Sequence, residues 1–75
     1  MWSIEVTDTF GGESNFSWVR RGVTRANTPR AIREAVKNLA GWNCRVFMQD
    51  FGDTIEFRPA ENAGICEVAF ATWKD

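Results

Sequence analysis

Histidine and tyrosine are both absent from this sequence of 75 residues. Without histidine, the chain has no imidazole general base, no Ser–His or Cys–His nucleophile pair and no imidazole metal ligand. Cysteine is scarce as well, because Cys44 and Cys66 are the only two, whereas a structural zinc site normally takes four Cys or His ligands. We therefore expect no catalytic residues, no metal, no cofactor and no enzymatic activity.

The sequence also lacks a long hydrophobic run and a secretory leader. No stretch approaches the roughly 18 apolar residues that cross a bilayer, and residues 1–5 have neither a basic start nor an apolar block. These absences predict a complete cytoplasmic chain. In that compartment Cys44 and Cys66 are expected to stay reduced and to be buried as small core residues.

Apolar and aromatic residues are plentiful. They make up 44% and 13% of the chain, with four tryptophans and six phenylalanines. This composition excludes intrinsic disorder, which requires low hydrophobicity. Because single domains usually contain 100 to 200 residues, the sequence predicts a single domain over residues 1–75.

Alternating apolar and polar residues predict five strands. Two are expected before residue 25, at 2–7 and 16–23, with glycine-containing turn residues at 8–15 between them. Three more are expected at 44–49, 54–58 and 65–73, separated by turns at 50–53 and 59–64. In the last of these strands, Cys66, Val68 and Phe70 share one face.

One helix is predicted from Thr28 to Gly41. Thr28 is a suitable N-cap, Pro29 suits the first helical position, and Gly41 can adopt the left-handed conformation that ends a helix. Between these signals, an apolar stripe follows helical spacing. It consists of Ile32, Ala35, Val36 and Leu39.

The element order ββαβββ predicts an α+β domain with an antiparallel sheet and one helix packed on one face. A helix of this length spans about 20 Å, close to the length of six or seven strand residues. The helix can therefore run from one end of the sheet to the other. This places the turns 8–15 and 59–64 at one end, and the connection 20–28 and the turn 50–53 at the opposite end.

Charge is unevenly distributed along a chain whose net charge is −1. Residues 20–37 contain six cations and one anion, whereas the rest contains three cations and nine anions. The segment can be a solvated surface that only adds solubility, or a basic strip that binds a phosphate backbone or an acidic protein. Because Trp and Arg dominate protein–protein hot spots, the predicted binding residues are Arg20, Arg21, Arg25, Arg30, Arg33, Lys37, Trp18 and Trp42.

Acidic residues provide an alternative binding surface. Asp8 and Glu13 belong to one predicted turn and Glu61 to another, and the predicted topology brings both turns to the same end of the sheet. Carboxylates clustered in this way could occupy a basic nucleic-acid-binding groove of a partner protein. Which of the two surfaces binds is left open by the sequence.

Two segments of the sequence resemble known proteins. The start, Met1-Trp2-x-Ile4-Glu5-Val6-x-Asp8-Thr9-Phe10-Gly11-Gly12-Glu13 with Trp18-Val19-Arg20-Arg21, is similar to small bacteriophage- and prophage-encoded proteins of unknown function. The end, Gly52-Asp53-x-Ile55-Glu56-Phe57-Arg58-Pro59 with Ala69-Phe70-x-x-Trp73, is similar to the same group. In size and element order, although not in motif, the chain also resembles anti-CRISPR proteins. This resemblance assigns no role to any residue.

Together these observations lead to a functional hypothesis. The resemblance implies a non-enzymatic viral protein that acts in the bacterial host cell by occupying a surface of a host complex, with a CRISPR–Cas effector as the candidate partner. The alternative is a small nucleic-acid-binding accessory protein that uses the basic segment 20–37. Neither hypothesis involves a membrane, and the oligomeric state stays undetermined by the sequence.

Overall fold

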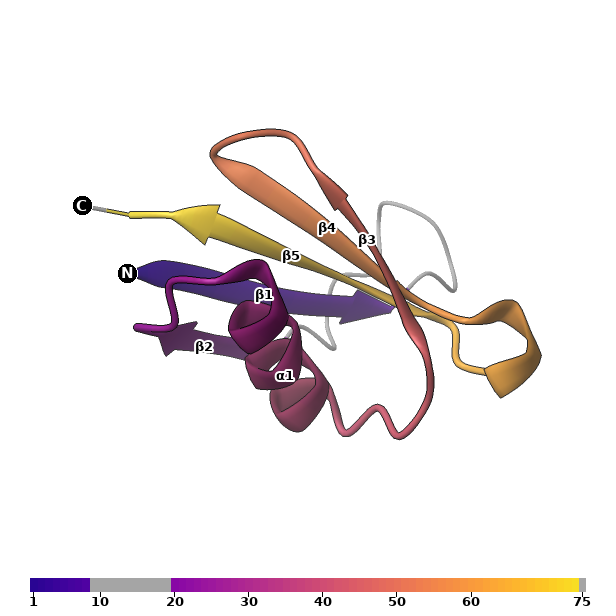
Figure 1. The fold of residues 1–75 in the computed structure, drawn as a ribbon. Helices are drawn as coiled ribbons and strands as arrows, with labels where there is room; N and C mark the ends of the chain where they lie inside the picture. Colours follow the sequence, from indigo (N-terminus) through magenta and orange to yellow (C-terminus); the bar gives the residue numbers. More distant parts are fainter. Residues whose placement is uncertain (9–19, 75) are drawn as a thin grey trace.

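The structure is a computed structural model that describes residues 1–8 and 20–74. Its elements are β1 (Trp2–Asp8), β2 (Arg20–Thr24), α1 (Pro29–Ala40), β3 (Val46–Asp50), β4 (Thr54–Pro59), a 3₁₀ turn η3 (Glu61–Ala63) and β5 (Glu67–Trp73). This order confirms the predicted α+β fold (Figure 1). Of the second predicted strand, the part before Arg20 lies outside the described residues.

The strands form one antiparallel sheet in the order β2-β1-β5-β4-β3. β1 and β2 pair directly, and β3, β4 and β5 form a meander whose last strand returns beside β1. β1 and β5 therefore lie inside the sheet, while β2 and β3 form its two edges. The twist of the sheet is visible in Figure 1, where β3 and β4 cross the direction of β1.

The helix begins and ends at the predicted capping residues. The Thr28 Oγ1 accepts a hydrogen bond from the Ala31 N–H at 3.2 Å, and Pro29 occupies the first turn. Gly41 has a φ of 74°, and the N–H groups of Gly41 and Trp42 both donate to the Lys37 carbonyl, at 2.8 and 3.0 Å. These bonds satisfy groups that a helix terminus leaves unpaired, so the local sequence defines α1.

One face of α1 packs against the sheet. Ile32, Val36 and Ala40 are buried, and Ala35 and Leu39 pack partly buried against the same core. The predicted stripe is thus confirmed, with Ala40 added. The helix contacts β1, β2 and β5. Its close approach to β2 depends on Gly22, where an added Cβ would lie 3.1 Å from Leu39 Cδ2.

The sheet side chains divide into a covered face and an uncovered face. Ile4 and Val6 of β1 lie opposite Ala71 and Ala69 of β5, and all four are buried. Alternation then places Val68 and Phe70 on the uncovered face, the face turned away from α1. Val68 and Phe70, the larger apolar residues in the middle of β5, therefore face outward, and the buried positions beside them are Ala69 and Ala71.

The two cysteines differ from expectation. Neither forms a disulfide; Cys44 is half-buried against the core, but Cys66 is exposed. The prediction of a buried Cys66 is wrong because β5 begins at Glu67, and Cys66 belongs to the irregular connection before it. A regular strand beginning at residue 65 was inferred from the alternating pattern, which continues into the connection.

The two ends of the sheet carry different connections. The Asp53 carbonyl in the β3–β4 turn accepts from the Trp73 N–H at 2.8 Å, and the Trp73 ring packs edge-on against Trp2 at 5.5 Å. This end also contains the residues between β2 and α1, since Trp2 pairs with Thr24. η3 lies at the other end, as predicted for the turn 59–64 (Figure 1), and the bond between Arg20 and Ala40 places the C-terminus of α1 beside the start of β2. Most of the predicted turn 8–15 lies outside the described residues.

Over the part of the chain that the structure describes, no helix is long and apolar enough to cross a membrane.

Candidate interaction surfaces

The predicted basic strip divides between two faces of the domain. Arg20 and Arg21 are neighbours in β2 and therefore point to opposite faces of the sheet. Arg20 donates from Nη1 to the Ala40 carbonyl at 2.7 Å, and its Nη2 lies 3.4 Å from Glu67 Oε2. Because Ala40 is the last residue of α1, the Arg20 guanidinium stabilises the C-terminus of the helix.

Trp42 belongs to the same structural cluster. Its side chain is only 4% exposed, and its indole Nε1–H donates to Glu67 Oε1 at 2.9 Å. The structure thus places Trp42 in the core and not on a binding surface. This residue follows the Gly41 cap directly and belongs to the same buried cluster as Phe57 of β4 and Val46 of β3.

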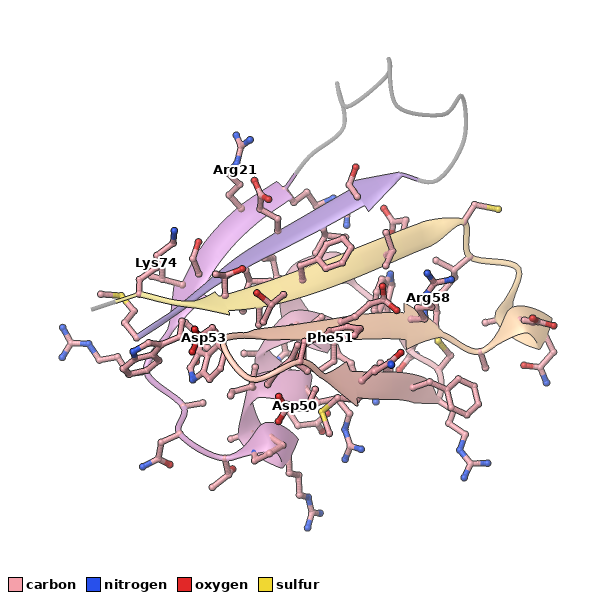
Figure 2. All side chains as sticks on the ribbon, turned by 90° about the horizontal axis from the view of Figure 1, so that it is seen from above. Arg21, Asp50, Phe51, Asp53, Arg58 and Lys74 are labelled. Carbon is pink, nitrogen blue, oxygen red and sulfur yellow. The ribbon has the colours of Figure 1, made fainter. Side chains whose placement is uncertain are left out.

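Two further cations of the strip have carboxylate partners. Arg21 lies on the uncovered face, where its Nε donates to Glu5 Oε1 at 2.8 Å (Figure 2). Lys37 lies 3.8 Å from Glu34 on the helix surface. Surface pairs of this kind contribute only about 0–1 kcal/mol to stability. Both cations can therefore give up these pairs and bind a partner molecule. Trp18 lies outside the described residues.

Three arginines of the strip have no such partner. Arg25, Arg30 and Arg33 form no hydrogen bond or ion pair with any residue in 1–8 or 20–74. Arg25 and Arg30 are exposed, and Arg33 is half-buried. We refer to these three residues as the α1 arginine group, since they occupy the first turns of the helix and the connection before it.

The electrostatic position of this group is unusual. The N-terminal turn of a helix carries a partial positive charge, which favours acidic residues and disfavours cations by typically about 0.3–1 kcal/mol each. The first turn of α1 contains Arg30 and no acidic residue. The Arg30 charge therefore gains nothing from the helix dipole, in contrast to Arg20, which bonds to the helix C-terminus.

The alternative acidic surface is only partly described. The backbone of Asp8 pairs with Glu67 at the end of β1, and Glu61 is exposed in η3 beyond the end of β4. Both residues thus lie at the same end of the sheet, as predicted. Glu13 lies outside the described residues.

A groove beside β3 was missed by the sequence analysis. It has a volume of about 870 Å³ and lies between β3, β4 and the segment 60–68. Phe47 at its rim is 56% exposed, the Arg45 guanidinium carbon lies 5.9 Å from the ring centroid, and Arg58 pairs with Phe47 across the strands. An exposed aromatic ring between two arginines is typical of protein interaction sites. The apolar run Val46-Phe47-Met48 was the signal in the sequence, because alternation places Phe47 on one face of the strand and Met48 on the other.

The charges around this groove are mixed. Glu61 and Glu67 line it together with Arg45 and Arg58. Arg58 donates from Nε to Glu56 Oε1 at 2.8 Å, and this hydrogen bond, followed by the charge of Glu56, raises the pKa of Arg58. Figure 2 shows Arg58 near the end of β4. The groove therefore presents no concentrated positive field that would select an anionic ligand.

The thiol and carboxylate side chains are dispersed over the described part of the chain. In residues 1–8 and 20–74, no three Cys, Asp or Glu side chains come close enough together to hold a metal ion. Comparison of the chain with protein-family models, with curated proteins and with solved structures gives no match. Any functional proposal therefore rests on the placement of the side chains and on the expectation drawn from the sequence resemblance.

Proposed function

We propose that this protein is a non-enzymatic binding protein, which attaches through the α1 arginine group to an anionic surface of a macromolecular complex. The observation that carries the proposal is that Arg25, Arg30 and Arg33 have no ion-pair partner within residues 1–8 and 20–74, and that Arg30 stands in the first turn of α1, where a cation is disfavoured. A charge that brings no structural benefit serves either solubility or an intermolecular partner, and our proposal assigns these three arginines to a partner. Arg is also the cation best suited to bind carboxylates or phosphates in a bidentate manner.

The resemblance to small phage proteins supplies the candidate partner. It supports a bacterial host complex of the CRISPR–Cas type, with this protein as an inhibitor that covers part of its surface. An acidic protein surface is favoured over nucleic acid for two reasons. The net charge of the chain is −1, and the cations of segment 20–37 do not line one continuous face, since Arg20 and Arg21 point to opposite sides.

The experiment compares two double variants that lose the same charge. Arg30→Gln/Arg33→Gln removes two cations of the α1 arginine group. Arg21→Gln/Arg58→Gln removes two cations from the uncovered face, where both side chains are mostly exposed. Affinity for purified CRISPR–Cas effector complexes is measured by surface binding, together with the melting temperature of each variant. We expect the first variant to lose at least about tenfold in affinity, since one hot-spot residue contributes about 2 kcal/mol or more, and the second to bind like the wild type.

Other outcomes have definite meanings. If the α1 variant binds normally and the uncovered-face variant does not, the binding surface has been misplaced. If no effector complex binds, and the wild type instead shifts DNA with an affinity that falls steeply with salt, the nucleic-acid alternative is correct. In that case the salt slope should decrease in Arg30→Gln/Arg33→Gln, because each lost phosphate contact lowers it by about one.

A further inference from the structure

The β3 edge of the sheet is the feature that the proposed function does not use. Among the strands of the described residues, β3 is the last in the sheet and pairs only with β4. Its middle residues are apolar on both faces: Phe47 on the uncovered face is 56% exposed, and Met48 on the helix side is 40% exposed. Figure 1 shows α1 lying beside β1 and β2, away from this strand.

The hydrogen bonds next to β3 determine which of its backbone groups are unpaired. The Phe51 N–H donates to the Thr54 carbonyl, and the Ala60 N–H donates to the Arg45 carbonyl. In an antiparallel ladder the residues that bond to a given neighbour alternate. Residues 45, 47, 49 and 51 therefore bond toward β4, and the N–H and C=O groups of Val46, Met48 and Asp50 point outward from the sheet.

Edge strands of natural proteins usually carry features that prevent pairing. Typical features are a lysine, a proline, a bulge or a covering helix. β3 has the sequence Val-Phe-Met-Gln-Asp, which contains no lysine and no proline, and its one charged residue, Asp50, stands at its end. The strand pairs with β4 without a break in register, so it has no bulge. Outward donors and acceptors combined with exposed apolar side chains form a template for another strand.

We propose that the occupant is a second copy of this chain, paired antiparallel through β3 about a two-fold axis at Phe47. The two sheets would then continue into one another. On the uncovered face, Phe47 lies opposite Phe47 of the second copy. On the helix side, Val46 lies opposite Met48 of the second copy, and by symmetry Met48 lies opposite Val46 of the second copy. This proposal does not depend on the proposed function.

Symmetry and chemistry select both the partner and the register. A two-fold axis perpendicular to the sheet keeps each side chain on its own face, so it must pass through a residue position and not between two. An axis at Met48 would place Val46 against Asp50, whereas an axis at Phe47 places apolar against apolar residues and Arg45 against Gln49. No charged residue then faces a like charge. In this register β3 is complementary to itself, so a second copy of the same chain supplies the matching strand.

The backbone pattern agrees with the same register. Because Phe47 bonds toward β4, it would occupy a non-hydrogen-bonded position in the new pair, where opposite Cα atoms are only about 4.5 Å apart and side chains are closest. Aromatic pairs at such positions are among the more stabilising cross-strand contacts. Val46 and Met48, with their outward groups, would form the hydrogen-bonded positions on either side.

The test measures self-association by sedimentation equilibrium over a range of concentrations. The wild type is expected to form dimers of twice the 8.5 kDa chain mass. Phe47→Lys should raise the dimer dissociation constant at least tenfold. Val23→Lys is the matched control, since Val23 is 67% exposed on the same face of the opposite edge strand, and it should change the constant less than twofold.

A backbone variant tests the edge independently of charge. Met48→Pro removes an outward N–H and leaves the bonds to β4 intact, so it should abolish dimerisation while circular dichroism stays native. The register is tested by oxidation in a Cys44→Ala/Cys66→Ala background. There Phe47→Cys should form an intermolecular disulfide readily, and Met48→Cys should not, because the two copies of residue 48 are offset by two positions.

Several results would overturn the proposal. A wild type that stays monomeric up to its solubility limit would do so, as would a dimer that survives Phe47→Lys. Equal weakening by Val23→Lys would mean that the interface is not confined to β3. Rapid cross-linking of Met48→Cys in place of Phe47→Cys would overturn the register.

Discussion

The two edges of the sheet are treated differently by the same chain. At the β2 edge, α1 lies against the strand, Leu39 fits into the space above Gly22, and Arg20 reaches the last carbonyl of the helix. At the β3 edge, Phe47 and Met48 are left exposed on the two faces. The helix covers the inner face of the first edge strand, whereas it makes no comparable contact with the second among the described residues.

The order of elements explains this difference. A single helix of 12 residues follows β2 directly and packs back beside it. The remaining three strands come after the helix and are added on the other side of β1, so β3 is the strand farthest from β2. Trp42 extends the core in that direction, but the buried part of β3 ends at Val46.

The two proposals reinforce one another if both are correct. A dimer joined at β3 would contain two α1 arginine groups. Both would stay outside the dimer interface, because α1 packs toward the opposite edge of each sheet. Two equivalent surfaces in one particle bind a partner with repeated sites more tightly than either surface alone. The β3 variants would then weaken binding to such a partner without touching the arginines.

The largest effect on stability is expected where the helix closes the β2 edge. Leu39→Ala removes a side chain that is partly buried between α1 and Gly22. Full burial of such a leucine is worth about 2–5 kcal/mol, so we expect a loss near the lower end, about 2 kcal/mol. Urea denaturation provides the measurement. An unchanged midpoint would mean that Leu39 does not seal this edge.

The close approach at Gly22 can be tested by a double-mutant cycle. Gly22→Ala alone should destabilise by about 1 kcal/mol, since the new Cβ would lie only 3.1 Å from Leu39 Cδ2. In the Leu39→Ala background the same change should be neutral or stabilising by about 0.5 kcal/mol, because alanine suits a strand better than glycine. Additive free energies of unfolding would show that the two residues are not coupled.

A smaller effect should separate two neighbouring arginines of the β2 edge. Arg20→Gln loses a charge-assisted bond to the Ala40 carbonyl and the contact with Glu67, and we expect a loss of about 1 kcal/mol. Arg21→Gln loses only an exposed pair with Glu5 and should cost less than about 0.5 kcal/mol. Thermal unfolding of both variants gives the comparison. Equal losses would show that the bond from Arg20 to the Ala40 carbonyl adds no more stability than an exposed ion pair.

Local patterns predicted the fold well. The Thr28, Pro29 and Gly41 signals located α1, because capping depends on residues adjacent in sequence. Strand alternation gave the number and order of the strands. It did not give the face that α1 covers in β5: alternation placed Cys66, Val68 and Phe70 on one face without choosing between the two, and the helix covers Ala69 and Ala71 on the other. That choice depends on how closely two distant segments approach.

The candidate site was less predictable for the same reason. Six cations close together in sequence were treated as one strip with Trp18 and Trp42 beside it. In the structure Arg20 donates to the last carbonyl of the helix, and Trp42 is buried in the core. Side-chain partners such as Glu67, 47 residues from Arg20, cannot be assigned from local sequence. The exposure of Phe47 depends on the strand order, which places β3 at an edge.

The smallest effect on the isolated chain is expected at the β3 edge itself. Phe47→Thr replaces a side chain that is 56% exposed with another residue that favours strands, so the unfolding free energy of the monomer should change by less than about 0.5 kcal/mol. Dimerisation makes stability depend on concentration, because a partner that binds only the folded state shifts the unfolding equilibrium. The melting temperature of the wild type should therefore rise with protein concentration, and that of Phe47→Thr should not. Val23→Thr, the corresponding change at the β2 edge, should keep the concentration dependence of the wild type; if it also removes it, the two edges are equivalent and the asymmetry argued from α1 is wrong.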